Sequence, residues 1–261
     1  FNLMVGILFG RRAMHHNVDK KLLHLGQYGR PGGECQDVAF AKILHTHMAT
    51  FSQTPLGQFE SDAAASCFDR IVMLFVFAIL STWGAPVSAL QMWELALYHI
   101  VHSVKTALGV SSSSYHYTPD TPVIGPGQGS RGGPAACSIA TSPLLTSMDQ
   151  LSHGISFTDP TQQLHYSTCA KMFVDDNTNY SNRFLPWLHN PPHPNAVRDM
   201  IQHDAQTWER LLWTSGGLLK LEKCLYYLMI WTFDVEGTAS LTPASQLPSM
   251  ELSSGDSGIS T

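Results

Sequence analysis

The segment from Phe173 to Asp176 constrains the fold most strongly, because an apolar strand pattern runs directly into two adjacent carboxylates. The stretch 177–179, Asn-Thr-Asn, follows, and Asp and Asn are residues that tight turns favour. The pattern predicts a hairpin with Asp175 and Asp176 at its tip. Two interpretations of this pair remain. The pair is either turn chemistry alone, or a device that brings two hard oxygen ligands, the kind Mg²⁺ prefers, to one point.

Other periodic segments predict an α+β layered domain with helices on one face of a sheet. Strands are expected at Gln58–Ser61, Lys171–Val174 and Cys224–Phe233. Ile71–Leu108 is apolar enough for two packed helices that break near Gly84-Ala85-Pro86. Its most apolar part is about ten residues long, which is too short to cross a bilayer.

A further helix is expected at Asn195–Ser215, with Asn195 as N-cap and Gly216 just past its end. Helical spacing places one set of side chains on the buried face: Val197, Ile201, Trp208 and Leu212. The same spacing turns another set toward water: Gln202, Gln206 and Glu209.

Composition limits the function classes. The net charge is −5 and only 13% of residues are charged, which counts against a nucleic-acid binder, although local basic patches remain compatible with it. Five widely spaced cysteines without C-x-x-C argue against a disulfide framework or a zinc ribbon and favour a reducing compartment. Of the 13 histidines, His15, His16, His45 and His47 are metal candidates, but ordinary surface or core roles are favoured.

Asp62 stands at the end of the first predicted strand, before an alanine run that leads to Phe68. A carboxylate in this place can join Asp175 and Asp176 at a metal site. It can equally serve as the N-cap of a following helix, which Asp does well.

A glycine-rich stretch covers residues 125–134. Its glycines allow backbone N–H groups to approach a phosphate or a base closely. Gly127, Gly129 and Gly132 also fit G-x-G-x-x-G, which favours a distant alternative, a nucleotide-binding oxidoreductase with a parallel sheet. Three prolines in 118–126 argue against the preceding strand which that fold needs. A plain flexible loop is the third reading.

Lys223 lies in a segment that follows the predicted helix and leads into a strand. A lysine held there can donate a proton, whereas the simpler reading is a solvated lysine beside a turn.

In this order, the motifs resemble those of reverse transcriptases, the RNA-directed DNA polymerases, of retrotransposon-type mobile elements. Gln128 and Pro134 are six residues apart, Phe173-Val174-Asp175-Asp176 fits the aromatic-x-Asp-Asp motif, and Gly216 stands seven residues before Lys223, with Cys224 following. Upstream, the stretch 27–32 resembles the fingers segment. The likeness covers roughly residues 26–235.

The resemblance implies a right-hand polymerase with fingers and palm, an antiparallel palm sheet, and a thumb that is absent or incomplete. On that pattern, residues 1–55 belong to the fingers, 56–70 hold the palm strand with the first catalytic Asp, and 71–124 form fingers and palm helices. Residues 125–235 form the palm and 236–261 a flexible tail.

The resemblance also implies residue roles. Asp62 and Asp175 would bind two Mg²⁺ or Mn²⁺ ions with help from Asp176, and Lys223 would be the acid for the leaving pyrophosphate. Contacts to the incoming nucleotide are expected from Phe68, Gln128, Gly129 and Arg30. The partners would be an RNA or DNA template with a primer, and dNTPs, in an intracellular compartment (nucleus or cytoplasm) without a membrane.

One spacing departs from the family pattern. The aromatic residue usually stands five residues after the Asp, but Phe68 stands six after Asp62, as if one alanine had been added. A misplacement of about 1 Å can cost on the order of 100-fold in rate. An inactive, truncated relic of the same fold is therefore the second reading.

Overall fold

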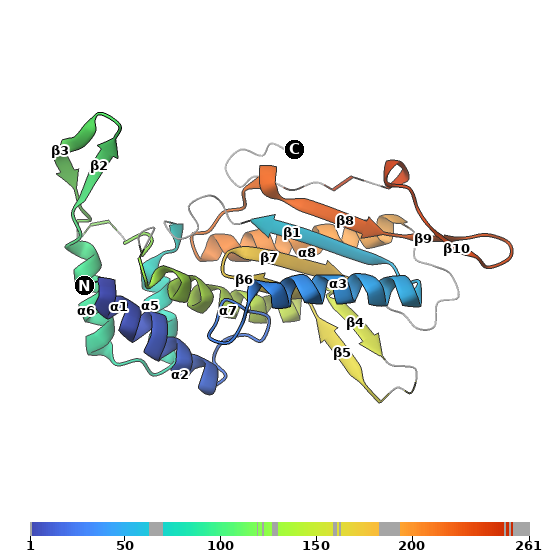
Figure 1. Cartoon of the computed structure of the whole chain (residues 1–261), viewed down its shortest axis with the longest axis horizontal. Coiled ribbons are helices and arrows are strands. Elements are labelled where there is room, and N and C mark those ends of the chain that lie inside the picture. The colour runs from blue at the N-terminus through green and yellow to red at the C-terminus, as the bar shows by residue number, and fades with distance from the viewer. Residues whose placement is uncertain are drawn as a thin grey trace. The chain divides into compact units, whose positions relative to one another are not determined.

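The computed structural model describes residues 2–62, 70–118, 120–121, 123–126, 130–158, 161, 163–182, 194–247, 249–250 and 252. The chain separates into two units (Figure 1). Unit 1 comprises Phe1–Leu23 and Ser66–Ala140, and unit 2 comprises His24–Ala65 and Thr141–Thr261.

A four-stranded antiparallel sheet forms the centre of unit 2, in the order β6-β7-β1-β8. Its strands are β1 (Leu56–Asp62), β6 (Ala170–Phe173), β7 (Asp176–Ser181) and β8 (Leu225–Met229). The first two predicted strands are thus confirmed. The third is divided, because β9 (Trp231–Phe233) leaves the sheet and pairs with β10 (Ala239–Leu241). Every pairing between two named strands in the described part of the chain is antiparallel, so the parallel sheet of the oxidoreductase alternative is wrong.

Helices cover both faces of this sheet, and the expectation of one covered face is wrong. Helix α8 (Pro194–Thr214) packs on β1 and β7, so closely that a Cβ added to Gly57 would lie 2.9 Å from the Cβ of Ile201. Helix α3 (Cys35–Ser52) lies on the opposite face (Figure 1). There the ring of its His45 contacts the ring of Tyr180 on β7, with 4.5 Å between the ring centroids. With both faces covered, β1 is buried along most of its length, and such a strand lacks the usual alternation.

The α3 face has its own apolar core. Strands β4 (Ile155–Thr158) and β5 (His165–Thr168) pair as a hairpin, and β4 contributes to the cluster Ala49, Leu56, Ile155, Phe157 and Tyr180. Burial, then the charge of Lys171, lowers the pKa of His45 to about 4. His45 is therefore a neutral core histidine, as the simpler reading expected.

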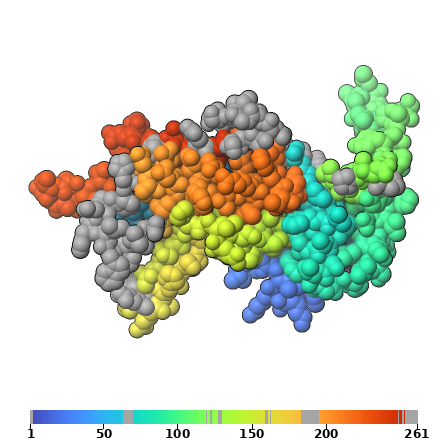
Figure 2. All heavy atoms as spheres, turned by 180° about the vertical axis from the view of Figure 1, so that it is seen from behind, coloured from blue at the N-terminus to red at the C-terminus, as the bar shows by residue number. Residues whose placement is uncertain are grey.

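Helix α8 begins and ends within one residue of its predicted bounds and spreads over one face of unit 2 (orange in Figure 2). Val197, Ile201, Trp208 and Leu212 are all buried as expected. Gly216 has a φ of 88°, the left-handed conformation of a residue just past a helix end. Glu209 is only 3% exposed, so its predicted exposure is wrong. Burial raises the pKa of Cys224, and the charge of Glu209 adds to this shift, so the two side chains lie near each other.

Unit 1 is mostly helical. The N-terminal segment forms α1 (Asn2–Ile7), a π-helical stretch (Leu8–Ala13) and α2 (Met14–Asp19). The two predicted helices form as α5 (Met73–Thr82) and α6 (Val87–Tyr98), which pack together. Gly84, with a φ of 87°, lies in the turn between them.

Strands β2 (His102–Thr106) and β3 (Gly109–Tyr115) follow as a hairpin, where the second helix was expected to continue. Helix α7 (Gly133–Leu151) begins in unit 1 and ends in unit 2. Two single 3₁₀ turns, at Leu221–Lys223 and Ala244–Gln246, complete the elements. Nowhere in the described ranges is there a helix of the length and apolar character needed to span a membrane.

Candidate active site

Three carboxylate residues come together at one end of β1 and β7. Asp62 and Asp176 are direct partners across the two antiparallel strands. Phe173 and Asp176 close the β6–β7 hairpin as a pair, which leaves Val174 and Asp175 as its two-residue turn. The electrostatics agree with this arrangement, because the charges of Asp176 and Asp62 both act on Asp175.

The hairpin turn is strained at Val174, which has a φ of 59°. Two-residue hairpins favour turns with positive φ because these match the twist of the strands, and Gly usually takes that position. A β-branched residue there is an outlier. Such strain persists only where the surroundings determine the conformation, and it is common at functional sites.

Gln27 supplies part of that support. Its side chain is fully buried, and its Oε1 accepts hydrogen bonds from the N–H of Gly29 at 2.8 Å and of Val174 at 3.4 Å. Its Nε2 donates to Thr141 Oγ1 at 2.9 Å. The backbone on either side of Gln27 pairs with Met172 of β6. No spacing in the sequence marks Gln27 for this role, because the side-chain partners of Gln27 other than Gly29 lie more than 100 residues away.

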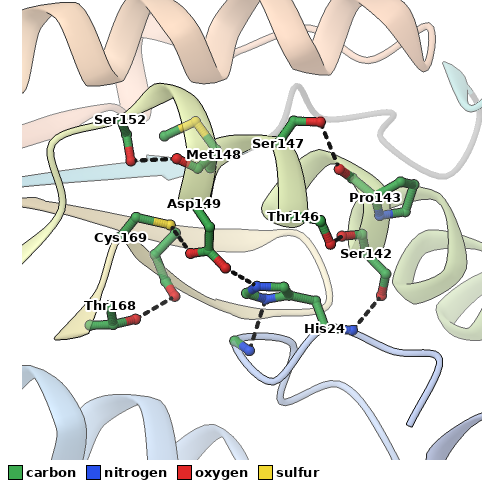
Figure 3. A network of polar contacts seen from close by, with 12 residues as sticks. His24, Ser142, Pro143, Thr146, Ser147, Met148, Asp149, Ser152, Thr168 and Cys169 are labelled. Atoms are coloured by element: carbon green, nitrogen blue, oxygen red, sulfur yellow. Dashed lines mark hydrogen bonds and ion pairs between the residues drawn. The ribbon is translucent and has the colours of Figure 1, made fainter. Parts of the chain in front are cut away.

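A second polar network fixes the chain just before Gln27. Figure 3 shows Asp149 of α7 between the ring of His24 and the thiol of Cys169. His24 Nδ1 accepts from the N–H of Gly26 at 3.0 Å, so Nε2 carries the proton and donates to Asp149 Oδ2 at 2.7 Å. The Cys169 thiol donates to Asp149 Oδ1 at 2.8 Å. Burial and the Asp149 contact raise the pKa of Cys169, so this group is structural and not a thiolate nucleophile.

Lys223 completes the site from the 3₁₀ turn that follows α8. Its Nζ donates to Asp62 Oδ2 at 2.5 Å. The backbone places it there, because the N–H of Lys220 donates to the carbonyl of Asp62 at the end of β1. The hydrogen bond and charge of Asp62 raise the pKa of Lys223, so the ammonium keeps its proton at neutral pH.

The negative charges at the hairpin affect one another's pKa values. Burial raises the pKa of Asp175, with the charges of Asp176 and Asp62 adding to it. Asp176 is more exposed, and partial burial of its carboxyl group, followed by the charge of Asp62, raises its pKa as well. Both carboxylates would therefore be stabilised by a nearby cation.

Asp62 and Asp176 border a cleft of about 330 Å³ between α3 and the sheet, which is lined on the α3 side by Cys35, Val38, Ala39 and Lys42. Lys42 forms an ion pair with Glu60 of β1 at 3.0 Å. Neither Lys42 nor Glu60 was expected at the site from the sequence, since neither belongs to a spaced motif.

The donor set fits Mg²⁺ in kind, because carboxylate oxygens are its preferred protein ligands. The spacing of the three carboxylate groups fits a bound ion less well. Within the described ranges, the three side chains whose ligand atoms all lie within 4.8 Å of one another are His153, His203 and Asp204, away from this cleft. The Asp62 carboxylate is instead held by the Lys223 ammonium.

The resemblance implied four further site residues: Phe68, Gln128, Gly129 and Arg30. Phe68, Gln128 and Gly129 lie outside the described residues. Arg30 lies in the loop before α3, where its carbonyl accepts from the N–H of Gly33. None of the described hydrogen bonds or ion pairs joins its guanidinium to Asp62, Asp175 or Asp176.

A comparison with protein-family models finds no match, and a comparison with curated proteins finds none. Among solved structures, the chain is similar to apo telomerase from Candida tropicalis truncated from its C-terminal domain, with a TM-score of 0.52 and 11% identity over 84% of this chain. Telomerases in complex with a TWJ fragment of telomeric RNA also match. That from Candida albicans has a TM-score of 0.46 at 14% identity, and that from Candida tropicalis 0.45 at 12%. The match with the Candida albicans structure covers 87% of this chain and 34% of the telomerase chain. The match with the Candida tropicalis complex covers 95% of this chain and 37% of the telomerase chain.

The chain spans 40% of the length of the first of these telomerase chains. At such low identity the likeness concerns the fold alone. Telomerase is a reverse transcriptase, so the chain has a reverse-transcriptase-like α+β fold with antiparallel sheets. The comparisons give no support to an origin in a retrotransposon.

Proposed function

We propose that this chain contains the fingers and palm of an RNA-directed DNA polymerase, with the four-stranded sheet of unit 2 in its palm. One observation carries the proposal: Asp62 and Asp176 are cross-strand partners, and Asp175 lies in the adjoining hairpin turn. Three carboxylates that converge on strand ends above a packed sheet make a rigid site for phosphoryl transfer. The likeness to the telomerase fold supports the same function.

Each site residue has a role in the proposal that follows from its chemistry. Asp62, Asp175 and Asp176 would hold Mg²⁺ or Mn²⁺, and a bound ion would lower the pKa of the primer 3′-hydroxyl and neutralise charge on the leaving phosphates. Lys223 stays protonated beside Asp62 and is the proton donor to the departing pyrophosphate. In the proposal, Phe68, Gln128, Gly129 and Arg30 contact the nucleotide. An RNA or DNA template with its primer, and dNTPs, are the partners.

An inactive relic of the same fold is the second candidate. The six-residue spacing from Asp62 to Phe68 favours it, and so does the Lys223–Asp62 ion pair, which occupies a carboxylate that the metal needs. The finer expectation of a mobile-element origin rests on motif spacing alone.

Primer extension on an RNA template with Mg²⁺ or Mn²⁺ tests the function. Asp175→Asn keeps the shape of the side chain but removes a negative ligand, so extension should collapse and added metal should rescue it little. Lys223→Ala removes the proton donor, a contribution of about 10²–10⁴-fold, and should lower the rate of nucleotide addition more than template binding.

A chain with Ala65 deleted provides the matched test of the spacing. Extension that appears or rises on deletion would identify the added alanine as a lesion. If both chains bind primer–template but neither extends it, the relic is the correct reading. If neither binds at low salt, where phosphate contacts are strongest, the polymerase assignment fails.

A further inference from the structure

A second group of ligand-type side chains lies at the far end of β7 from the acidic cleft. His153 Nδ1 is 2.8 Å from Asp204 Oδ1, and His203 Nδ1 is 3.2 Å from the same oxygen. The hydroxyl of Ser181, the last residue of β7, donates to Asp204 Oδ2 at 2.5 Å. Asp176 is the first residue of that strand, so the two groups are about 17 Å apart along it.

Asp204 is a buried carboxyl residue that is surrounded mainly by hydrogen-bond donors of the backbone and of neutral side chains. Its side chain is fully buried, and the N–H of His153 donates to both carboxylate oxygens at 3.1 Å. A buried charge is costly unless it is paired. Among its described hydrogen bonds and ion pairs, the partners that can carry positive charge are the imidazoles of His153 and His203.

The geometry of the three side chains suits a transition-metal ion. Imidazole nitrogen and carboxylate oxygen are ligands of Zn²⁺, with bonds of about 2.0–2.2 Å, which places tetrahedral ligand atoms roughly 3.3 Å apart. The two N···O distances given above are close to that value, and all three ligand atoms lie within 4.8 Å of one another. The histidine side chains are 33% and 53% exposed, so the site opens to solvent on one side.

We propose that His153, His203 and Asp204 form a binding site for a divalent transition-metal ion of the zinc class. The three protein ligands leave a fourth position for water. A bound ion would balance the buried Asp204 carboxylate and tie α8 to the segment between α7 and β4. This site is independent of the proposed polymerase chemistry, because imidazole ligands favour zinc over the Mg²⁺ that carboxylates prefer.

Calorimetric titration of the EDTA-treated full chain with Zn²⁺, in excess Mg²⁺, tests the proposal. His203→Ala and His153→Ala should each lose one equivalent of bound Zn²⁺. His47→Ala removes an exposed imidazole from α3, on the other face of the sheet, and should lose none. Asp175→Asn should also keep this equivalent, which separates the site from the acidic cleft. In the unmutated chain, Zn²⁺ at 100 times its dissociation constant should raise the melting temperature by roughly 5–10 °C.

Two results would overturn the proposal. One is an equal loss of Zn²⁺ in His47→Ala and His203→Ala, which indicates general binding by surface histidines. The other is unchanged stoichiometry in the double variant H153A/H203A. If His153→Ala unfolds the chain, His203→Ala alone serves as the test, because His203 is exposed. The measurement is then the visible absorption of bound Co²⁺. A d–d band that persists in His203→Ala contradicts the site.

Discussion

At the scale of single residues, the candidate site combines strain with charge repulsion, and both act against stability. Val174 adopts left-handed backbone in the turn that carries Asp175, while Asp175 and Asp176 have raised pKa values. Buried contacts offset these costs, among them the hydrogen bond that Gln27 Oε1 accepts from the N–H of Val174 in the turn. Destabilising features concentrated around three carboxylates are what a functional site, and not a plain hairpin tip, would contain.

Replacing Val174 with glycine should relieve the strain. A left-handed conformation costs an L-residue roughly 1–2 kcal/mol, and glycine adopts it without a Cβ penalty. We expect Val174→Gly to raise the free energy of unfolding by about 1 kcal/mol in urea denaturation. Val110→Gly, on an exposed strand outside the site, should lower it. A destabilised Val174→Gly chain would show that side-chain packing outweighs backbone strain in the turn.

The raised pKa of Asp175 has a definite consequence for stability. Its folded-state pKa lies above the unfolded value of about 3.8, so the folded chain binds the proton more tightly. Stability is therefore greatest at low pH with respect to this group and falls as pH rises from the unfolded pKa through the folded one. We expect Asp175→Asn to melt at a higher temperature than the unmutated chain at pH 7.

The difference between these two chains should shrink as pH approaches 3, where Asp175 is protonated in both states. Glu236→Gln, which removes an exposed carboxylate, should change the melting temperature little at either pH. A melting temperature of Asp175→Asn below that of the unmutated chain at pH 7 would mean that the ionised carboxylate stabilises the fold.

At the scale of elements, local pattern predicted a helix with one face in water and two strands that turn residues mark off. Helix α8 has such a face, and its bounds and buried residues follow from helical spacing. Strands β1 and β6 were found because β-branched or aromatic residues lie between turn signals. Helix α3 was missed as a sheet layer, since its buried residues, Val38, His45 and Ala49, form a weak apolar stripe.

The site could be predicted only as far as local motifs reach. Asp62, Asp175, Asp176 and Lys223 each stand at the end of a recognisable strand or after a recognisable helix, and the structure brings them together. Gln27, Lys42 and the His153–His203–Asp204 group depend on tertiary pairing between distant segments. No periodicity encodes such pairing, so a single sequence gives no signal for it.

Helix α8 should be a main source of stability for unit 2. Trp208 is 1% exposed and Trp213, on the same helix, is 41% exposed. Truncating a buried tryptophan removes its transfer free energy and leaves a cavity, so Trp208→Ala should cost about 3–5 kcal/mol. Trp213→Ala should cost much less. Equal losses in urea denaturation would contradict the packing of α8 against the sheet.

At the scale of the whole molecule, the net charge of −5 hides an asymmetry between the units. Unit 1 has seven Lys and Arg against four Asp and Glu, a net +3, and unit 2 has eight against sixteen, a net −8. Charge asymmetry between parts of a chain suggests an interaction with a nucleic acid or with a membrane surface. The acidic total therefore does not exclude a nucleic-acid partner, provided that unit 1 contacts its phosphates.

The exposed basic groups of the N-terminal helical segment are the first place to test this. Arg11 and Arg12, with His15 and His16, line a surface hollow in unit 1. Each phosphate contact contributes about 0.9 to the slope of log affinity against log salt, so a double Arg11→Ala, Arg12→Ala variant should lower that slope by up to about 2. Fluorescence anisotropy with a labelled RNA–DNA primer–template, at several salt concentrations, measures it.

A variant with Arg198→Ala and Arg210→Ala provides the control, because it removes the same two charges from α8 in the acidic unit. Its slope should stay near that of the unmutated chain. If both variants lose the same slope, net charge alone governs binding and unit 1 has no phosphate-contacting surface at this segment. If neither loses any, the phosphates lie elsewhere, and the +3 charge of unit 1 does not reflect a nucleic-acid surface around Arg11 and Arg12.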